Sequence, residues 1–187
     1  TMATSKDLGI SDQLYQYGVR FNRNLVVDAQ CAPMVMDAGP NGDQRNMQVF
    51  NWYFAPVAIA QGVNHPITTN LDPIHFDFAS SLDSVDAPGK LRKTVLLSSS
   101  EMSREYKSPV RVSSSIVELT PEYFTQNPKP HQPLALLVEG TFQSAFLNRL
   151  PSVLENDPEF AFASQSLSTA QIFISDGDMA RNKVKPG

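Results

Sequence analysis

The clearest pattern of apolar and polar positions lies in the middle of the chain. In Ile74–Phe78 every second residue is apolar, the period-2 pattern of a half-buried β-strand. The Thr94–Leu97 run does not alternate. It is typical of a strand covered on both faces or, at this length, of a buried helical segment. Between the two runs Asp86–Gly89 predicts a turn, because proline fixes φ and glycine accepts positive φ. This region therefore predicts the middle of a sheet.

Further strands are predicted on both sides of this region. The segments that predict them are Leu25–Val27, Met47–Phe54, Pro109–Val117, Leu134–Val138 and Gln171–Ser175. We interpret Cys31–Arg45 as a loop, because prolines and glycines interrupt it, with a short edge strand at Met34–Met36.

Helical signals are short and few. Ser11 has the N-cap position of a helix over Asp12–Tyr17, and Gly18 follows where a left-handed residue commonly ends a helix. Thr120 and Pro121–Phe124 predict one further helical turn, with proline at its first position.

These elements define the expected fold class. Phe142 and Phe146 are four residues apart, as on one face of a helix, while Asn127–Pro133 carries three prolines and predicts an extended connection. Parallel strands need long crossovers, and few helical segments are present to supply them. We expect an α/β or α+β fold: a single domain with a mixed sheet of about five to seven strands, substantial antiparallel pairing, few short helices and long loops.

Composition narrows the class of protein. The 187 residues are 41% hydrophobic and 18% charged, which is typical of a globular chain, and no run reaches the roughly 18–20 apolar residues of a membrane-spanning helix. Net charge is −4, and the basic residues are scattered apart from Lys90–Lys93 and the tail residues Lys183 and Lys185. This distribution argues against a nucleic-acid partner. The start Thr-Met predicts a fragment of a larger protein.

Two aspartates are the only place where an enzymatic interpretation begins. Asp176 and Asp178 follow a predicted strand, where a metal or catalytic carboxylates could lie, but aspartates equally end strands and cap turns. The serine runs Ser98–Ser100 and Ser113–Ser115 lack the GxSxG arrangement of a nucleophile elbow. We expect the aspartates to be turn residues that bind no metal.

Histidine and cysteine offer no second site. The three histidines, at His65, His75 and His131, lack the HxxxH or HxH spacing of a metal pair. Cys31 has no second cysteine, and nothing adjacent predicts a lowered pKa. We expect solvated loop histidines, a buried structural thiol and no cofactor.

An aromatic triplet supplies the best candidate binding surface. Trp52 and Tyr53 could line a groove for a sugar or a peptide. Trp52 and Phe54 also share one face of a predicted strand, which favours Trp52 as a core residue. Both interpretations remain open from the sequence.

Five collinear stretches resemble one family. They are YGVRFNRNLVVDAQCAP (Tyr17–Pro33), NHPITTNLDPIHFDFASSLDSV (Asn64–Val85), KTVLLSSSEMSREY (Lys93–Tyr106), PLALLVEGTFQSAFLNR (Pro133–Arg149) and QIFISDGDMARN (Gln171–Asn182). Over nearly the whole chain, these resemble the gliding-motility-associated ABC-transporter auxiliary proteins of Bacteroidetes. The order NLDPI, FASS, LLSSS and EGTF is the most specific part of the likeness.

This resemblance implies a membrane-anchored protein, encoded with an ABC-transporter permease and ATPase. It implies an α/β domain on the periplasmic face of the inner membrane, related to the glutamine-amidotransferase-like fold, with no catalytic residue to carry over. Flanking membrane helices and the β–α units before Asp7 are missing from the sequence. We therefore expect residues 1–187 to be one extracytoplasmic domain of a larger protein.

The leading hypothesis is a non-enzymatic auxiliary domain of an ABC transporter complex associated with gliding motility. It would bind an envelope partner or the transported substrate. Two alternatives remain: a glycan- or peptide-binding module that uses Trp52 and Tyr53, and a hydrolase-like enzyme that uses Asp176, Asp178 and a serine.

Overall fold

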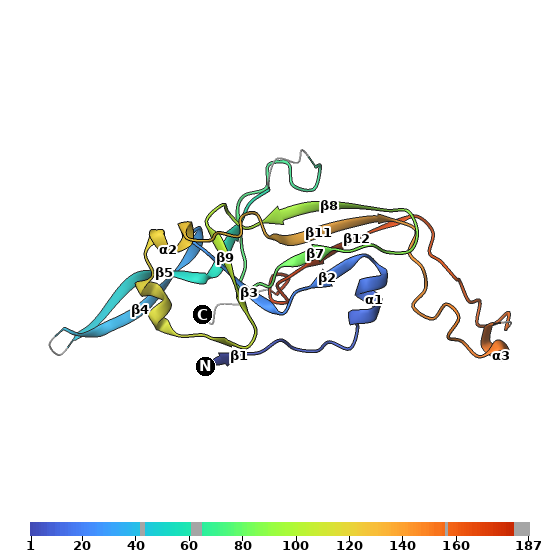
Figure 1. Ribbon diagram of the computed structural model, residues 1–187, viewed down its shortest axis with the longest axis horizontal. Helices are drawn as coiled ribbons and strands as arrows, with labels where there is room; N and C mark the ends of the chain where they lie inside the picture. The colour runs from blue at the N-terminus through green and yellow to red at the C-terminus, as the bar shows by residue number, and fades with distance from the viewer. Residues whose placement is uncertain (42–43, 61–64, 156, 182–187) are drawn as a thin grey trace, which may run out of the picture.

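The computed structural model describes residues 1–41, 44–60, 65–155 and 157–181. The molecule is elongated, with a strand-rich body between two projections (Figure 1). One projection is the long hairpin of β4 (Cys31–Asn41) and β5 (Gln44–Ala58), and the other is the segment that carries the short helix α3 (Ser152–Glu155). Lys183 and Lys185, which we noted in the basic tail, lie outside the described residues.

Strand pairing is antiparallel throughout the described chain and is divided among five small sheets. Two-stranded pairs are formed by β1 (Met2–Ala3) with β10 (Val110–Arg111), β2 (Val19–Phe21) with β7 (Leu82–Ser84), and β3 (Asn24–Asp28) with β9 (Ser103–Lys107). The three-stranded sheets place β5 between β4 and β6 (Ile74–His75), and β11 (Pro133–Gly140) between β8 (Leu91–Ser98) and β12 (Thr169–Ile174).

The expected single mixed sheet of five to seven strands is therefore wrong. The protein is mostly strands with few short helices: α1 (Ser11–Gln16), the 3-10 helix η1 (Ser114–Glu118), α2 (Pro121–Thr125) and α3. Helices of four to six residues are too short to cross over a sheet and return the chain in a parallel direction, so neighbouring strands pair antiparallel. In the described part of the chain, every helix is too short and too polar to span a membrane.

The predicted C-terminal end of helix α1 is confirmed. Gly18 has a φ of +79° just beyond the helix, as expected of a left-handed end residue. The predicted start is wrong by one residue, because Ser11 is already helical and Ile10 occupies the N-cap position without a side-chain hydrogen bond. Helix α2 follows Thr120 and has Pro121 in its first turn, as predicted.

The strands predicted from the most apolar runs are confirmed. Leu25–Val27 lies in β3, Thr94–Leu97 in β8 and Leu134–Val138 in β11. The hairpin differs from its prediction, because Cys31–Asn41 forms the strand β4 and Gln44–Arg45 begins β5, where we expected a loop with only a short strand at Met34–Met36. Cross-strand pairing with β5 overrides the local prolines and glycines, and register shifts between Cys31/Pro33 and Asp37/Pro40 accommodate them.

Three predicted elements are shorter than expected or absent. Strand β6 ends at His75, and Phe78 has a φ of +52°, which a strand excludes. Within Pro109–Val117 the strand is limited to β10, and the 3-10 helix η1 begins at Ser114. The helix expected through Phe142 and Phe146 is a series of turns, in which Phe142 is buried and Phe146 is 63% exposed.

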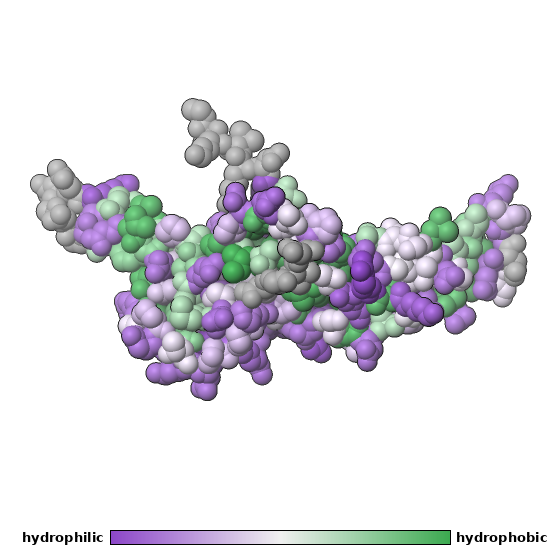
Figure 2. Space-filling model, turned by 90° about the horizontal axis from the view of Figure 1, so that it is seen from above, coloured by the Kyte–Doolittle hydropathy of each residue, from purple (hydrophilic) through white to green (hydrophobic). Residues whose placement is uncertain are grey.

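The core consists of three hydrophobic clusters that share strands. In β3, Val26 belongs to the first cluster and the next residue, Val27, to the second. In β11, Leu137 belongs to the first cluster and Leu136 to the third. Because both strands are buried on two faces, they join the clusters into one body. Figure 2 shows hydrophobic patches on the surface of both projections. Val49 in β5 and Leu167 in the segment between α3 and β12 are among the exposed apolar side chains.

Candidate functional site

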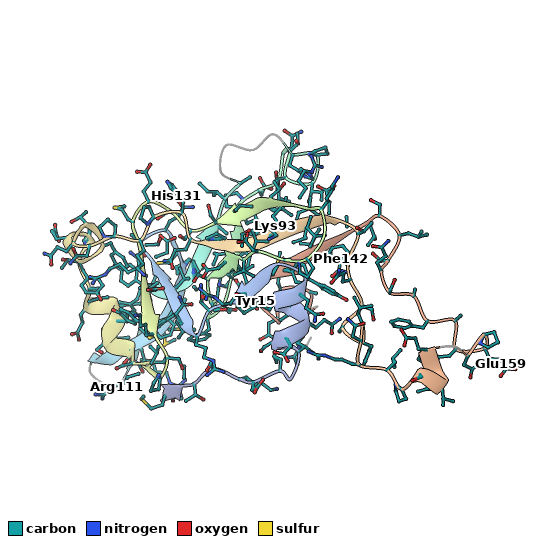
Figure 3. The ribbon with its side chains drawn as sticks, turned by 45° about the vertical axis from the view of Figure 1, so that its right-hand side comes forward. Tyr15, Lys93, Arg111, His131, Phe142 and Glu159 are labelled. Atoms are coloured by element: carbon teal, nitrogen blue, oxygen red, sulfur yellow. The ribbon has the colours of Figure 1, made fainter. Side chains whose placement is uncertain are left out.

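A polar groove of about 760 Å³ lies where the β2–β7 and β3–β9 pairs meet the proline-rich connection that precedes β11. Its volume is within the range of small-molecule and peptide sites. Its polar and charged lining includes Arg20, Arg23, Asn24, Ser81, Asp83, Glu105, Lys107, Lys129 and Gln132. Figure 3 shows His131, which also lines the groove, on the upper edge of the body, far from Glu159 at the tip of the α3 projection.

The floor of the groove is organised by the buried side chain of Asn24 in β3. Its Nδ2 donates to Ser81 Oγ at 2.9 Å and to Glu105 Oε2 at 2.7 Å, and its Oδ1 accepts from the backbone N–H of Ser81 at 3.0 Å. One amide therefore ties together β3, β9 and the approach to β7. A buried amide whose donors and acceptor are all satisfied holds its neighbours in one arrangement.

One wall of the groove is the Asn127–Pro133 connection, which is tied to the first residue of β9, Ser103. The backbone N–H of Lys129 donates to Ser103 O at 2.8 Å, and Ser103 Oγ donates to Lys129 O at 2.6 Å. Prolines have no backbone N–H that needs an acceptor, so this connection requires few hydrogen bonds. The two reciprocal hydrogen bonds between Lys129 and Ser103 fix its middle.

The end of the wall is held by the serines that follow β8. Gln132 N–H donates to Ser99 Oγ at 2.8 Å, and Ser99 N–H donates back to Gln132 O at 3.0 Å. His131 N–H donates to Ser100 O at 3.1 Å. The serine run after β8 therefore holds this part of the connection with two backbone hydrogen bonds and one that a serine side chain accepts.

Asp28 holds the turn that contains Ser100 through hydrogen bonds. Its buried carboxylate accepts from the Ser100 N–H at 2.7 Å, from Ser100 Oγ, and from the Gln30 N–H at 2.9 Å. Burial raises the pKa of Asp28, although the hydrogen bonds from Ser100 and Gln30 act in the opposite direction. Ser100 Oγ also accepts from the Met102 N–H at 3.0 Å, so this hydroxyl is part of a turn and contacts no histidine that could activate it.

The charges in the groove are only partly paired. Arg20 forms an ion pair with Asp83, and Lys129 forms one with Glu105. Burial acts to raise the pKa of Glu105, but hydrogen bonds from Lys129 and Asn24 and the nearby positive charges outweigh it and leave the pKa below its ordinary value. The cations Arg23 and Lys107 form no ion pair within the described chain.

The aromatic candidates lie elsewhere, at the base of the β4–β5 hairpin. Trp52 is half-buried, with its ring centroid 5.5 Å from that of Phe54 and 6.3 Å from that of Phe78. Tyr53 is 6% exposed, and its hydroxyl donates to Leu119 O at 3.1 Å. A ligand-binding role for Trp52 and Tyr53 stays a prediction.

The aspartates after β12 form a local turn. Asp176 accepts from the backbone N–H of Asp77 and from that of Asp178, each at 2.8 Å. Asp178 lies 3.6 Å from Arg181, and neither aspartate lines the groove. These contacts show two carboxylates that terminate a strand and orient the backbone after it.

Metal ligands do not gather in the described residues: no group of three His, Cys, Asp or Glu side chains is close enough to hold an ion. His75 pairs with Asp77 at 3.1 Å, and His131 lies 4.0 Å from Glu101. That the protein needs no metal and no cofactor stays a prediction.

Cys31 lies at the start of β4 and has no disulfide partner. Burial and the negative charge of Asp28 raise the pKa of its thiol to about 11. A thiol with this pKa is almost entirely protonated near neutral pH, which makes it a poor nucleophile.

The groove itself was missed by sequence reasoning. Asn24, Glu105 and Gln132 are separated by 81 and 27 positions along the chain, and nothing local to any of them predicts that they meet. The one usable signal was the combination of a proline-rich connection with two nearby serine runs, because serine side chains can satisfy an irregular backbone.

The structure thus defines a strand-rich protein with an open polar groove. The whole chain, residues 1–187, matches the family described as an ABC-type uncharacterized transport system, so the chain belongs to this family of ABC-transporter auxiliary proteins. No curated protein and no solved structure matched the chain. The relation to the glutamine-amidotransferase-like fold therefore stays a prediction.

Proposed function

We propose that this chain is the extracytoplasmic domain of a membrane-anchored, non-enzymatic auxiliary protein of an ABC transporter. It works beside the permease and ATPase on the periplasmic face of the inner membrane, in the gliding-motility systems of Bacteroidetes that its sequence resembles. The single observation that carries this proposal is the family match over all 187 residues. The groove supplies a surface on which an envelope partner or the transported substrate would bind.

The contacts of the candidate catalytic residues support a binding role over a hydrolytic one. Ser100 is held by Asp28, Ser99 by the Gln132 backbone, and Asp176 by two backbone N–H groups. Serine hydrolysis needs a hydroxyl that a positioned base activates toward a substrate. The Ser100 hydroxyl is instead held in a turn between the Asp28 carboxylate and the Met102 N–H, and the Ser99 hydroxyl lies between the Ser103 hydroxyl and the Gln132 N–H.

Purification of the full-length protein from its own membranes tests this proposal. We expect the permease and the ATPase to copurify with it after mild detergent extraction. The matched comparison is a deletion variant of the full-length protein that lacks residues 1–187. We expect this variant to lose the envelope partner or substrate while keeping its membrane location. Failure of the permease and ATPase to copurify with the intact protein would contradict the proposal.

A second candidate function is supported by the aromatic residues at the base of the hairpin. Trp52 is half-buried and Phe78 is 44% exposed, with their rings in edge contact, so one side of this pair is open to a sugar ring or a peptide side chain. A shift of Trp52 fluorescence that saturates with an oligosaccharide or peptide, and that is abolished in Phe78→Ala, would favour this function.

A further inference from the structure

We propose that the groove recognises carboxylate groups through Gln132, Arg23 and Lys107. This inference rests on the proposed binding role of the domain and names the chemistry of what it binds. Three observations carry it: an unpaired buried amide, an excess of positive charge and the polar character of the walls.

The amide of Gln132 has an unused donor. The residue is 8% exposed and lines the groove, yet its Nε2 has no hydrogen-bond partner in the part of the chain that the structure describes. Its backbone is fixed on both sides by Ser99. Buried donors are nearly always satisfied, so this group lacks an acceptor within the described chain. Because Nε2 is closed to water in the structure, a ligand in the groove becomes its acceptor only when the Gln132 side chain turns toward the opening.

The charged side chains that line the groove favour a negatively charged ligand. Arg20, Arg23, Lys107 and Lys129 line the groove together with Asp83 and Glu105, which leaves two more cations than anions among these residues. Ion pairs neutralise Arg20 and Lys129, so the excess lies on Arg23 and Lys107. The whole chain has a net charge of −4, so this local excess runs against the overall charge.

The backbones of the two excess cations are adjacent, with Arg23 just before β3 and Lys107 at the end of β9. Lys107 pairs in register with Asn24, the residue after Arg23, and the backbone carbonyl of Arg23 accepts from the Ser108 N–H at 2.9 Å. Arginine can bind both oxygens of a carboxylate at once, while lysine contributes a point charge. Together with Gln132 they offer donors to a carboxylate from two walls of the groove.

The carboxylates in the lining favour this class over phosphate. Asp83 and Glu105 would repel a phosphate that carries nearly two negative charges more strongly than a singly charged carboxylate. The volume of about 760 Å³ admits either a free carboxylic acid or an acidic segment of a peptide. Both sources share the same chemistry.

Calorimetric titration of the purified chain with three probes tests the inference. The probes are tetraglutamate, glutarate and tetraglutamine, the last being a neutral peptide of matched size. We expect saturable binding of tetraglutamate that weakens as salt is added, and no binding of tetraglutamine. Glutarate that binds as tightly as tetraglutamate would identify a free acid as the ligand, and markedly weaker glutarate an acidic peptide.

Substitutions in the groove test which residues bind the carboxylate. We expect Arg23→Gln/Lys107→Gln to weaken tetraglutamate binding by about tenfold or more, as the loss of direct charge contacts does. The control Lys90→Gln/Arg149→Gln makes the same change in net charge at exposed positions that do not line the groove, and should bind as the wild type does. Gln132→Met should weaken binding while it leaves the volume of the side chain nearly unchanged.

Three results would overturn the inference. They are the absence of saturable binding by both carboxylate probes at millimolar concentration, equal binding of tetraglutamine, and unchanged binding in the Arg23→Gln/Lys107→Gln variant. Circular dichroism of each variant confirms folding before titration. Copurification with the transporter reports the proposed function separately, so intact copurification without carboxylate binding would reject only this inference.

Discussion

At the scale of single residues, buried polar side chains position the candidate site. Asn24 and Asp28 lie in the same strand, and each accepts or donates three hydrogen bonds that join segments far apart in the sequence. Glu105 adds a charge to this arrangement, because it is held between the Asn24 amide and Lys129. Buried polar groups of this kind are costly to disrupt, since each partner is then left unsatisfied.

Glu105→Gln should lower the free energy of unfolding by about 1–2 kcal/mol at pH 7, because it removes charge-assisted hydrogen bonds. The pKa of Glu105 is lowered in the folded state from 4.5. The ionised carboxylate therefore stabilises the fold above the pKa of the unfolded chain, and this stabilisation is lost as pH falls through the lower folded pKa.

Urea denaturation at several pH values measures this effect. The difference between wild type and Glu105→Gln should be constant near neutral pH and should shrink as the pH falls below about 4.5. Glu159→Gln, at the exposed tip of the α3 projection, should show no difference at any pH. A difference between wild type and Glu105→Gln that grows as pH falls would contradict the assignment.

Gly18→Val should lower the free energy of unfolding by about 1–2 kcal/mol or more, because Gly18 has a φ of +79° and a β-branched residue is strained there. A Cβ at this position would also displace the flexible end of the Lys93 side chain and lie 3.1 Å from the Val85 carbonyl oxygen. Gly177→Val is the matched control, since a Cβ there meets no atom within 4 Å. Equal midpoints for the two variants in urea would show the strain argument to be wrong.

At the scale of elements, the proline-rich connection depends on serine side chains. Residues of this wall are fixed by Ser99, Ser100 and Ser103, where a regular strand would use only backbone groups. Prolines reduce the number of backbone donors that need partners and also limit the freedom of the unfolded chain. The wall of the groove is therefore rigid although it has no regular secondary structure.

Ser103→Ala should loosen this wall, because it removes the donor to Lys129 O and the 2.7 Å contact between the hydroxyls of Ser99 and Ser103. We expect a loss of about 1–3 kcal/mol in stability, the usual effect of unsatisfied buried partners. Hydrogen exchange should quicken at the amides of His131 and Gln132. Ser115→Ala removes an exposed hydroxyl and is the control; identical exchange in the two variants would count against the structural role of Ser103.

At the scale of the whole molecule, β3 and β11 couple the three hydrophobic clusters. Each strand contributes neighbouring residues to two clusters, so no cluster can lose its packing without exposing a strand that another cluster needs. The two projections extend from this body and do not contribute a cluster of their own among the described residues (Figures 1 and 2).

Leu136→Ala should test this coupling. The side chain is 1% exposed in the third cluster, and its truncation should cost about 2–5 kcal/mol. Trp52 packs against the second cluster and reports it by fluorescence. We expect the denaturation midpoint seen by Trp52 to fall together with the midpoint seen by circular dichroism, as in one cooperative transition.

The comparison variant is Leu167→Ala, because Leu167 is 91% exposed and its truncation should leave both midpoints unchanged. Separate midpoints in Leu136→Ala, with the Trp52 signal at its wild-type position, would mean that the clusters unfold independently.

Local sequence determined the elements whose physical causes are local. The runs Leu25–Val27 and Leu134–Val138 are strands, because continuous apolar residues need cover on two faces. Gly18 ends a helix and Pro121 begins one, because the permitted values of φ at glycine and proline do not depend on distant residues. The resemblance to a transporter auxiliary family was also readable from the sequence.

Only the tertiary structure decided how these elements pair and what the polar residues do. Cys31–Asn41 is a long strand because β5 offers it a partner, whereas the strand predicted at Ile74–Phe78 stops at His75 after two residues paired with β5. The groove brings together Asn24, Glu105 and Gln132 through strand pairings between distant segments. Hydrogen bonds between side chains depend on separations of a few ångströms, which residue spacing along a chain with long connections does not specify.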